Sequence, residues 1–94
     1  MQFHELIRNT RLKKKMTLRE LARRVELSPP FISKMEVGDF KPPKEENIVK
    51  IANALNLNSD ELLAMAGKIP SDVKTILLQN IKLYNYIRNL DKTI

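Results

Sequence analysis

The stretch from Thr17 to Glu36, TLRELARRVELSPPFISKME, has a pattern that predicts two short helices joined by a tight turn. The hydroxyl of Thr17 can cap the first helix while Glu20, three residues further on, reaches back to complete a capping box. Ser28 is a suitable N-cap for the second helix. Pro29 fits the first position of that helix, because the N–H that proline lacks would be unpaired there anyway.

Apolar residues of this stretch are spaced so that each helix has one hydrophobic face. They are Leu18, Leu21, Ala22 and Val25 in the first helix and Phe31, Ile32 and Met35 in the second. Gly38 lies just beyond the expected end of the second helix. Helix nucleation is costly, so two helices this short need flanking helices to hold them.

The charge of the chain suits a helix–turn–helix that places its second helix in the DNA major groove. Residues 1–36 hold nine Lys and Arg against four Asp and Glu, which gives this part five of the chain's net six positive charges. The sequence pI of about 9.8 indicates a polyanionic partner, with nucleic acid ahead of an anionic membrane.

Length and composition bound the class of protein. Ninety-four residues, 43% of them hydrophobic and 30% charged, are typical of one globular domain with a modest core. Only two glycines and a helical apolar spacing nearly throughout predict an all-α fold. The absence of cysteine excludes disulfides and thiolate metal sites and fits a reducing cytosol. No signal core or membrane-spanning run is found, so we expect a cytoplasmic protein with no membrane partner.

Further helices are expected on both sides of the motif. Residues 2–15 have the apolar spacing of an amphipathic helix, and residues 44–55 predict another after a proline-containing loop. Asn58 or Ser59 caps a shorter fifth helix, which Gly67 ends.

These five helices are expected to form one DNA-binding unit, residues 1–67, with Phe40 packed onto its core. Residues 68–94 are expected to form a helical extension, as one helix of about twenty residues whose apolar positions alternate in steps of three and four. This helix could fold back on its own domain. We favour a homodimer contact, because the five-helix unit already has a core. The residues expected in that contact are Val73, Ile76, Leu77, Asn80, Leu83, Tyr84, Ile87 and Leu90. Asn80 is expected to face inward and fix the register.

In the order of its motifs, the chain resembles the Xre family of bacterial and phage repressors, the lambda-repressor and Cro type of helix–turn–helix protein. The resemblance covers residues 4–67 and rests on the elements just described. They are a first helix with Arg11, then MTLRELARRV, then LSPPFISKMEVG with its S-x-x-x-I-S-x-x-E-x-G pattern, then PPKEENIVKIANAL and a short fifth helix. It implies a lambda-repressor-like five-helix domain that binds double-stranded DNA. Similar chains also occur as antitoxins and as controllers of restriction–modification genes.

The resemblance implies that Pro29, Pro30, Ser33 and Lys34 face the groove and contact bases. Lys34 can donate to guanine O6 or N7, and Ser33 can bond a base edge or a phosphate. The two prolines have no N–H to offer, so they could only make apolar contact, for instance with a thymine methyl. A purely structural role in starting the helix is the alternative for both prolines.

An ion pair between Arg11 and Glu36 is also implied by the resemblance. A partly buried bidentate pair would tie the recognition helix to the scaffold. The chain departs from the family pattern at two positions. Leu18 stands where a glutamine that touches phosphate is frequent, and Glu26 stands where a turn glycine is common.

Phosphate contacts are expected from helix caps and from cations that flank the recognition helix, among them Arg23. The predicted phosphate-contacting residues are Thr17, Arg19, Ser28, Lys41 and Lys44.

Enzymatic function finds little support in the sequence. The lone His4 has no nearby Cys, no acidic cluster has metal-ligand spacing, and there is no Gly-rich phosphate loop, so no metal or cofactor is expected. We therefore expect a repressor that acts as a homodimer on an inverted-repeat operator. The alternative is an antitoxin-type module whose C-terminal helix binds a partner protein, with DNA binding as autoregulation. A tight dimer through residues 70–94 favours the repressor, and a monomer with that helix exposed favours the partner.

Overall fold

The computed structural model of the chain describes residues 1–38 and 41–93, the last three of these by their backbone alone. Phe40 and Ile94 lie outside the described residues. The described part is all-α, as predicted, with no strand. Its helices are α1 (Phe3–Lys13), α2 (Leu18–Val25), α3 (Pro29–Glu36), α4 (Glu45–Leu55), α5 (Ser59–Met65), α6 (Ser71–Gln79) and α7 (Ile81–Thr93). None of these helices combines the length and hydrophobicity needed to cross a membrane.

Side-chain caps start α2, α3 and α5. In each, the side-chain oxygen of Thr17, Ser28 or Asn58 accepts a hydrogen bond from the amide three residues further on, at 3.1, 3.2 and 2.9 Å respectively. Asn58, and not Ser59, is therefore the N-cap of α5. Of the two bonds of the capping box predicted for α2, the described residues form only the one donated by the amide of Glu20.

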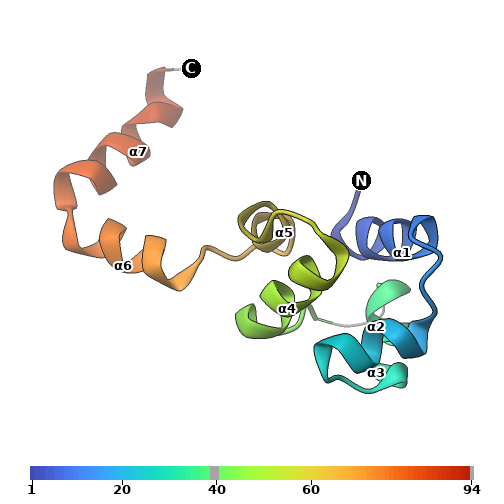
Figure 1. Cartoon of the computed structure of the whole chain (residues 1–94). Helices are drawn as coiled ribbons and strands as arrows, with labels where there is room; N and C mark the ends of the chain where they lie inside the picture. The colour runs from blue at the N-terminus through green and yellow to red at the C-terminus, as the bar shows by residue number, and fades with distance from the viewer. Residues whose placement is uncertain (39–40, 94) are drawn as a thin grey trace.

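Helices α1 to α5 enclose one hydrophobic core (Figure 1). Helix α2 packs on α3 and α4, α4 packs on α5, and α1 contacts α3 and α4. The largest fully buried side chains come from all five helices and are Ile7, Leu21, Val25, Ile32, Ile48, Ile51, Leu55, Leu62 and Leu63. The short helices α2 and α3 are thus held in place by their neighbours, as their cost of nucleation requires.

A tight turn joins α2 to α3. Glu26 ends α2 in the left-handed conformation, with φ 59°. The amides of Glu26 and Leu27 bond back to the carbonyls of Arg23 and Ala22, at 3.3 and 3.0 Å. Glycine adopts this left-handed backbone conformation most easily, but in this chain the position is occupied by a glutamate.

Beyond Gly67 the structure corrects the prediction of one continuous helix. Helices α6 and α7 are separated at Asn80, whose backbone is not helical (φ −127°, ψ 86°). The Asn80 Oδ1 accepts a hydrogen bond from the amide of Leu83 at 3.1 Å, so the side chain caps α7. Asparagine competes with the helix backbone inside a helix and is favoured at an N-cap. Asn80 therefore interrupts the single continuous helix in which it was expected to fix the register.

Helices α6 and α7 form what we call the arm, residues 71–93, which leaves the five-helix domain and bends at Asn80 (Figure 1). No residue of α6 is buried, and α6 packs chiefly on α7. The Arg88 Nη2 donates to the Tyr84 hydroxyl at 3.1 Å, and the guanidinium carbon lies 5.4 Å from the centroid of the Tyr84 ring. The arm therefore does not fold back on its own domain.

Candidate nucleic-acid interface

The outer face of α3 carries the four residues predicted to contact bases. Pro29, Pro30, Ser33 and Lys34 are all exposed, and steps of three and four residues place them on one side of the helix. The opposite side of α3 enters the core through buried residues such as Ile32. Figure 1 shows α3 on the side of the domain away from the arm.

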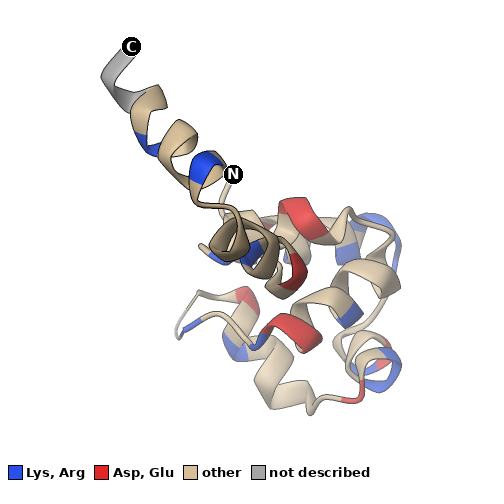
Figure 2. Ribbon diagram, turned by 90° about the vertical axis from the view of Figure 1, so that its left-hand side faces the viewer, with Lys and Arg blue, Asp and Glu red and all other residues tan. Residues whose placement is uncertain are grey.

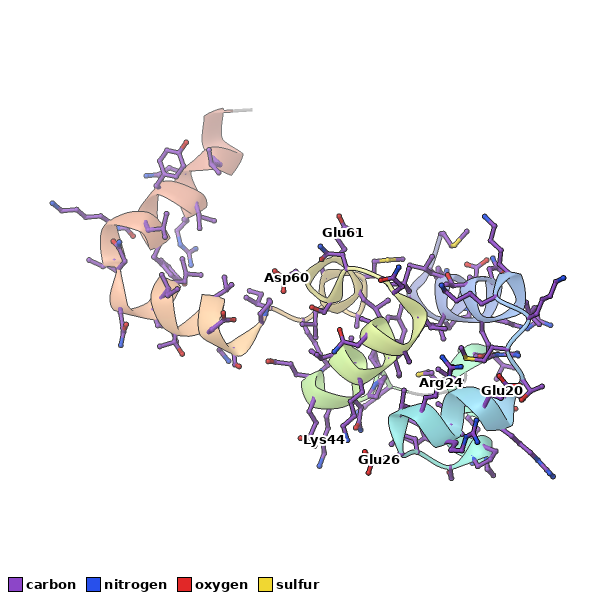
Figure 3. The ribbon with its side chains drawn as sticks, viewed as in Figure 1. Glu20, Arg24, Glu26, Lys44, Asp60 and Glu61 are labelled. Carbon is purple, nitrogen blue, oxygen red and sulfur yellow. The ribbon has the colours of Figure 1, made fainter. Side chains whose placement is uncertain are left out.

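All five residues predicted to contact phosphate lie at the surface, and two of them are the N-caps of α2 and α3. The exposed set is Thr17, Arg19, Ser28, Lys41 and Lys44. Lys44 is the N-cap residue of α4, and its side chain makes no capping bond. Figure 3 shows Lys44 at the start of α4, on the same lower side of the domain as Glu26 of the α2–α3 turn. Lys and Arg occur on several helices of the domain, with Asp and Glu between them (Figure 2).

Arg11 of α1 and Glu36, the last residue of α3, form the expected ion pair. The Nε of Arg11 donates to Oε2 of Glu36 at 2.7 Å and Nη2 donates to Oε1 at 2.9 Å, which makes the pair bidentate. A third bond runs from Nη1 to the carbonyl of Met16 at 2.7 Å. The two residues are only 7% and 5% exposed. Hydrogen bonding to Glu36 raises the pKa of Arg11, against the opposing effect of burial, so the guanidinium stays charged.

Gly38 follows the end of α3 in a conformation that favours glycine. Its φ is +74°, and its amide donates to the carbonyl of Met35 at 3.1 Å. A Cβ at this position would lie 2.9 Å from the imidazole of His4, which packs over the glycine from α1. The sequence predicted Gly38 after the helix, and no local pattern joins this position to His4. Among the described residues, no group of three or more His, Cys, Asp or Glu could hold a metal ion.

Two short helices joined by a tight turn, supported by three others and with the outer face of the second one open, define the class of helix–turn–helix DNA-binding regulators. The Helix-turn-helix family model matches residues 7–62, and the chain belongs to this family. This membership agrees with the resemblance to lambda-repressor-like regulators, and it makes the protein a transcriptional regulator and not an enzyme.

Relatives of known function and structure support this assignment. The HTH-type transcriptional repressor RghR of Bacillus subtilis (strain 168) is 32% identical over 96 residues, which cover 94% of this chain and 70% of RghR. The crystal structure of the clp gene regulator ClgR from Corynebacterium glutamicum is 26% identical, with a TM-score of 0.60 over 97% of this chain and 88% of ClgR. The structure of a SinR protein/SinI protein complex has a TM-score of 0.61 at 17% identity, covering 97% of this chain and 95% of that one, and shares the fold.

Proposed function

We propose that this protein is a transcriptional repressor that binds double-stranded DNA as a homodimer, at an operator made of an inverted repeat. The observation that carries the proposal is the open outer face of α3, where Pro29, Pro30, Ser33 and Lys34 are exposed together. Two such faces in a symmetric dimer enter successive major grooves, on half-sites about 34–36 Å apart. Bound over a promoter, the dimer blocks polymerase.

The chemistry of this face limits which bases it can recognise. Lys34 donates to guanine O6 or N7, and the two prolines offer only apolar contact, which suits a thymine methyl. The carboxylate of Glu36 is buried and bound by Arg11, so it does not face a base. Ser33 carries the remaining acceptor of this face. We therefore expect the outer face of α3 to recognise mainly guanine and thymine.

The arm supplies the dimer contact in this proposal. Five of its eight predicted contact residues are large, apolar and exposed, from 38% for Leu83 to 58% for Ile76. Leu77, Tyr84 and Ile87 line a hollow between α6 and α7. Apolar surface of this extent seldom stays in water, and the five-helix domain has a core of its own. In a symmetric dimer, the arm of the second subunit covers this apolar surface.

A partner protein is the second candidate for the arm. The same exposed apolar residues favour it, and the SinR neighbour was solved in a complex with the SinI protein. In that case the protein is an antitoxin-type module, and its DNA binding serves autoregulation.

Two measurements on the purified full chain test these proposals. Light scattering is expected to give twice the 10.9-kDa mass of one chain, whereas a monomer would contradict the homodimer and favour a partner protein. Binding to a DNA duplex is expected to weaken with salt, with a slope of about 0.9 in the logarithm of the affinity for each neutralised phosphate. Equal binding at low and moderate salt would contradict DNA as the ligand.

A further inference from the structure

Three hydrogen bonds join the five-helix domain to the arm at a single carboxylate. Ser71, the first residue of α6, donates its amide to Oε1 and Oε2 of Glu45 at 3.1 and 3.3 Å. The hydroxyl of Ser71 donates to Oε2 of the same carboxylate at 2.9 Å. Glu45 is itself the first residue of α4, so its side chain bridges the N-termini of two helices.

The electrostatic setting favours a carboxylate at this point. Each helix N-terminus carries partial positive charge, and Glu45 lies at the start of α4 while it binds the first amide of α6. Lys68 and Lys74 line the same surface hollow as Glu45 and Ser71. The negative charge of Glu45 is therefore stabilised by the N-termini of α4 and α6 and by the nearby lysines.

Little else in the described structure fixes the direction of the arm. Helix α6 buries no residue, so packing against the domain does not hold it. The linker contains Gly67, with φ +75°, followed by two residues and then Pro70, whose ring fixes its own φ. A Cβ added at Gly67 would meet no other atom within 4 Å, so no side chain packs against the linker at this point. A few surface hydrogen bonds are then enough to select one orientation.

We propose that Glu45 is a positioning residue, whose bonds to Ser71 set the angle between the arm and the recognition helix. This role rests on the proposed function, in which two arms join two domains on one operator. The direction of each arm then determines the separation of the two α3 helices. Glu45 thereby determines the half-site spacing that the dimer accepts, without touching DNA.

The test measures affinity for duplexes that carry two selected half-sites separated by spacers of different lengths. Wild-type protein is expected to prefer one spacing. Glu45→Ala, which loses all three bonds, is expected to reduce the preference for the best spacing over its neighbours by about five- to tenfold. Glu45→Gln keeps one acceptor oxygen and is expected to lie between the two.

Glu46→Ala is the matched control, because it removes the same charge from the same first turn of α4. Glu46 is exposed, and none of the described residues forms a hydrogen bond with its side chain. It is expected to keep the wild-type spacing. Affinity for a single half-site and dimer mass are expected to be unchanged in all variants.

Two different failures are distinguishable. If Glu45→Ala keeps the wild-type spacing preference while it binds as a dimer, the positioning role is wrong and the proposed function stands. If wild-type protein is a monomer, the homodimeric operator model is wrong, and the positioning role with it. If it is a dimer that accepts all spacings equally, only the positioning role is wrong.

Discussion

At the scale of single residues, Arg11 and Glu36 have a structural role and not one in base recognition. Their pair is bidentate and buried, and it connects α1 to the end of α3. Because the pKa of Arg11 is raised, its contribution to stability is fully present below the ordinary arginine pKa and is lost only as the pH rises through the raised value. The arginine side of the pair is therefore intact at neutral pH.

Glu36→Ala is expected to lower the free energy of unfolding by about 3–5 kcal/mol, because it leaves the buried guanidinium of Arg11 without its partner. Urea denaturation measures this loss. Glu46→Ala, at an exposed glutamate, is expected to change the same quantity by less than about 0.5 kcal/mol. A Glu36→Ala protein with wild-type stability that no longer binds DNA would contradict the structural role.

Pro29 and Pro30 are expected to contact thymine methyl groups. Replacing thymine by uracil in the selected half-site removes those methyls, and each contacted methyl is expected to cost about 0.8 kcal/mol, or about fourfold in affinity. Fluorescence anisotropy with singly substituted duplexes measures this effect. Thymines outside the half-site serve as controls. If no thymine in the half-site shows a loss, the prolines only start the helix.

At the scale of elements, the α2–α3 turn holds a glutamate in a left-handed conformation. Glu26→Gly is expected to stabilise the domain by about 0.5–1 kcal/mol, because relief of the left-handed strain exceeds the added entropy of the unfolded chain. Thermal and urea unfolding measure the change. Glu26→Ala, which keeps the strain, is the control. A glycine variant less stable than wild type would show that the Glu26 side chain itself stabilises the turn.

Local signals in the sequence were enough to place the first five helices. Thr17 and Ser28 predict the starts of α2 and α3, and the structure confirms both caps. The break at Asn80 was missed because the apolar steps of three and four continue across it. The capping bond of Asn80 to the next helix outweighs that periodicity.

Contacts between distant residues were harder to predict. The pair of Arg11 with Glu36 came from the family resemblance and not from spacing. The bonds of Ser71 to Glu45 join positions far apart in the chain, as does the packing of His4 over Gly38, and helical periodicity carries no information about either. These contacts depend on how the helices pack, which a single sequence does not reveal.

At the scale of the whole molecule, the arm determines whether two domains act together. Ile87 is 48% exposed and lines the hollow between α6 and α7. Ile87→Asp is expected to convert the dimer to a monomer and to weaken binding to the inverted repeat by about a hundredfold, because the second half-site no longer adds avidity.

Asn85→Asp is the matched control, since it places the same residue on the exposed surface of the same helix. It is expected to remain dimeric. Light scattering and DNA titration follow both variants. A dimeric Ile87→Asp protein would place the subunit contact elsewhere on the chain.

The proposed function requires the outer face of α3 to recognise DNA bases, and selection of bound sequences from random duplexes tests this requirement. Wild-type protein, Lys34→Ala and the control Lys50→Ala, which changes an exposed lysine of α4, are compared. We expect wild type and Lys50→Ala to enrich the same inverted repeat. Lys34→Ala is expected to lose the guanine preference at one position in each half-site, at a cost of about 1–3 kcal/mol, while the other positions stay the same. Identical selected sequences for wild type and Lys34→Ala, or no enrichment with wild type, would contradict base recognition by α3.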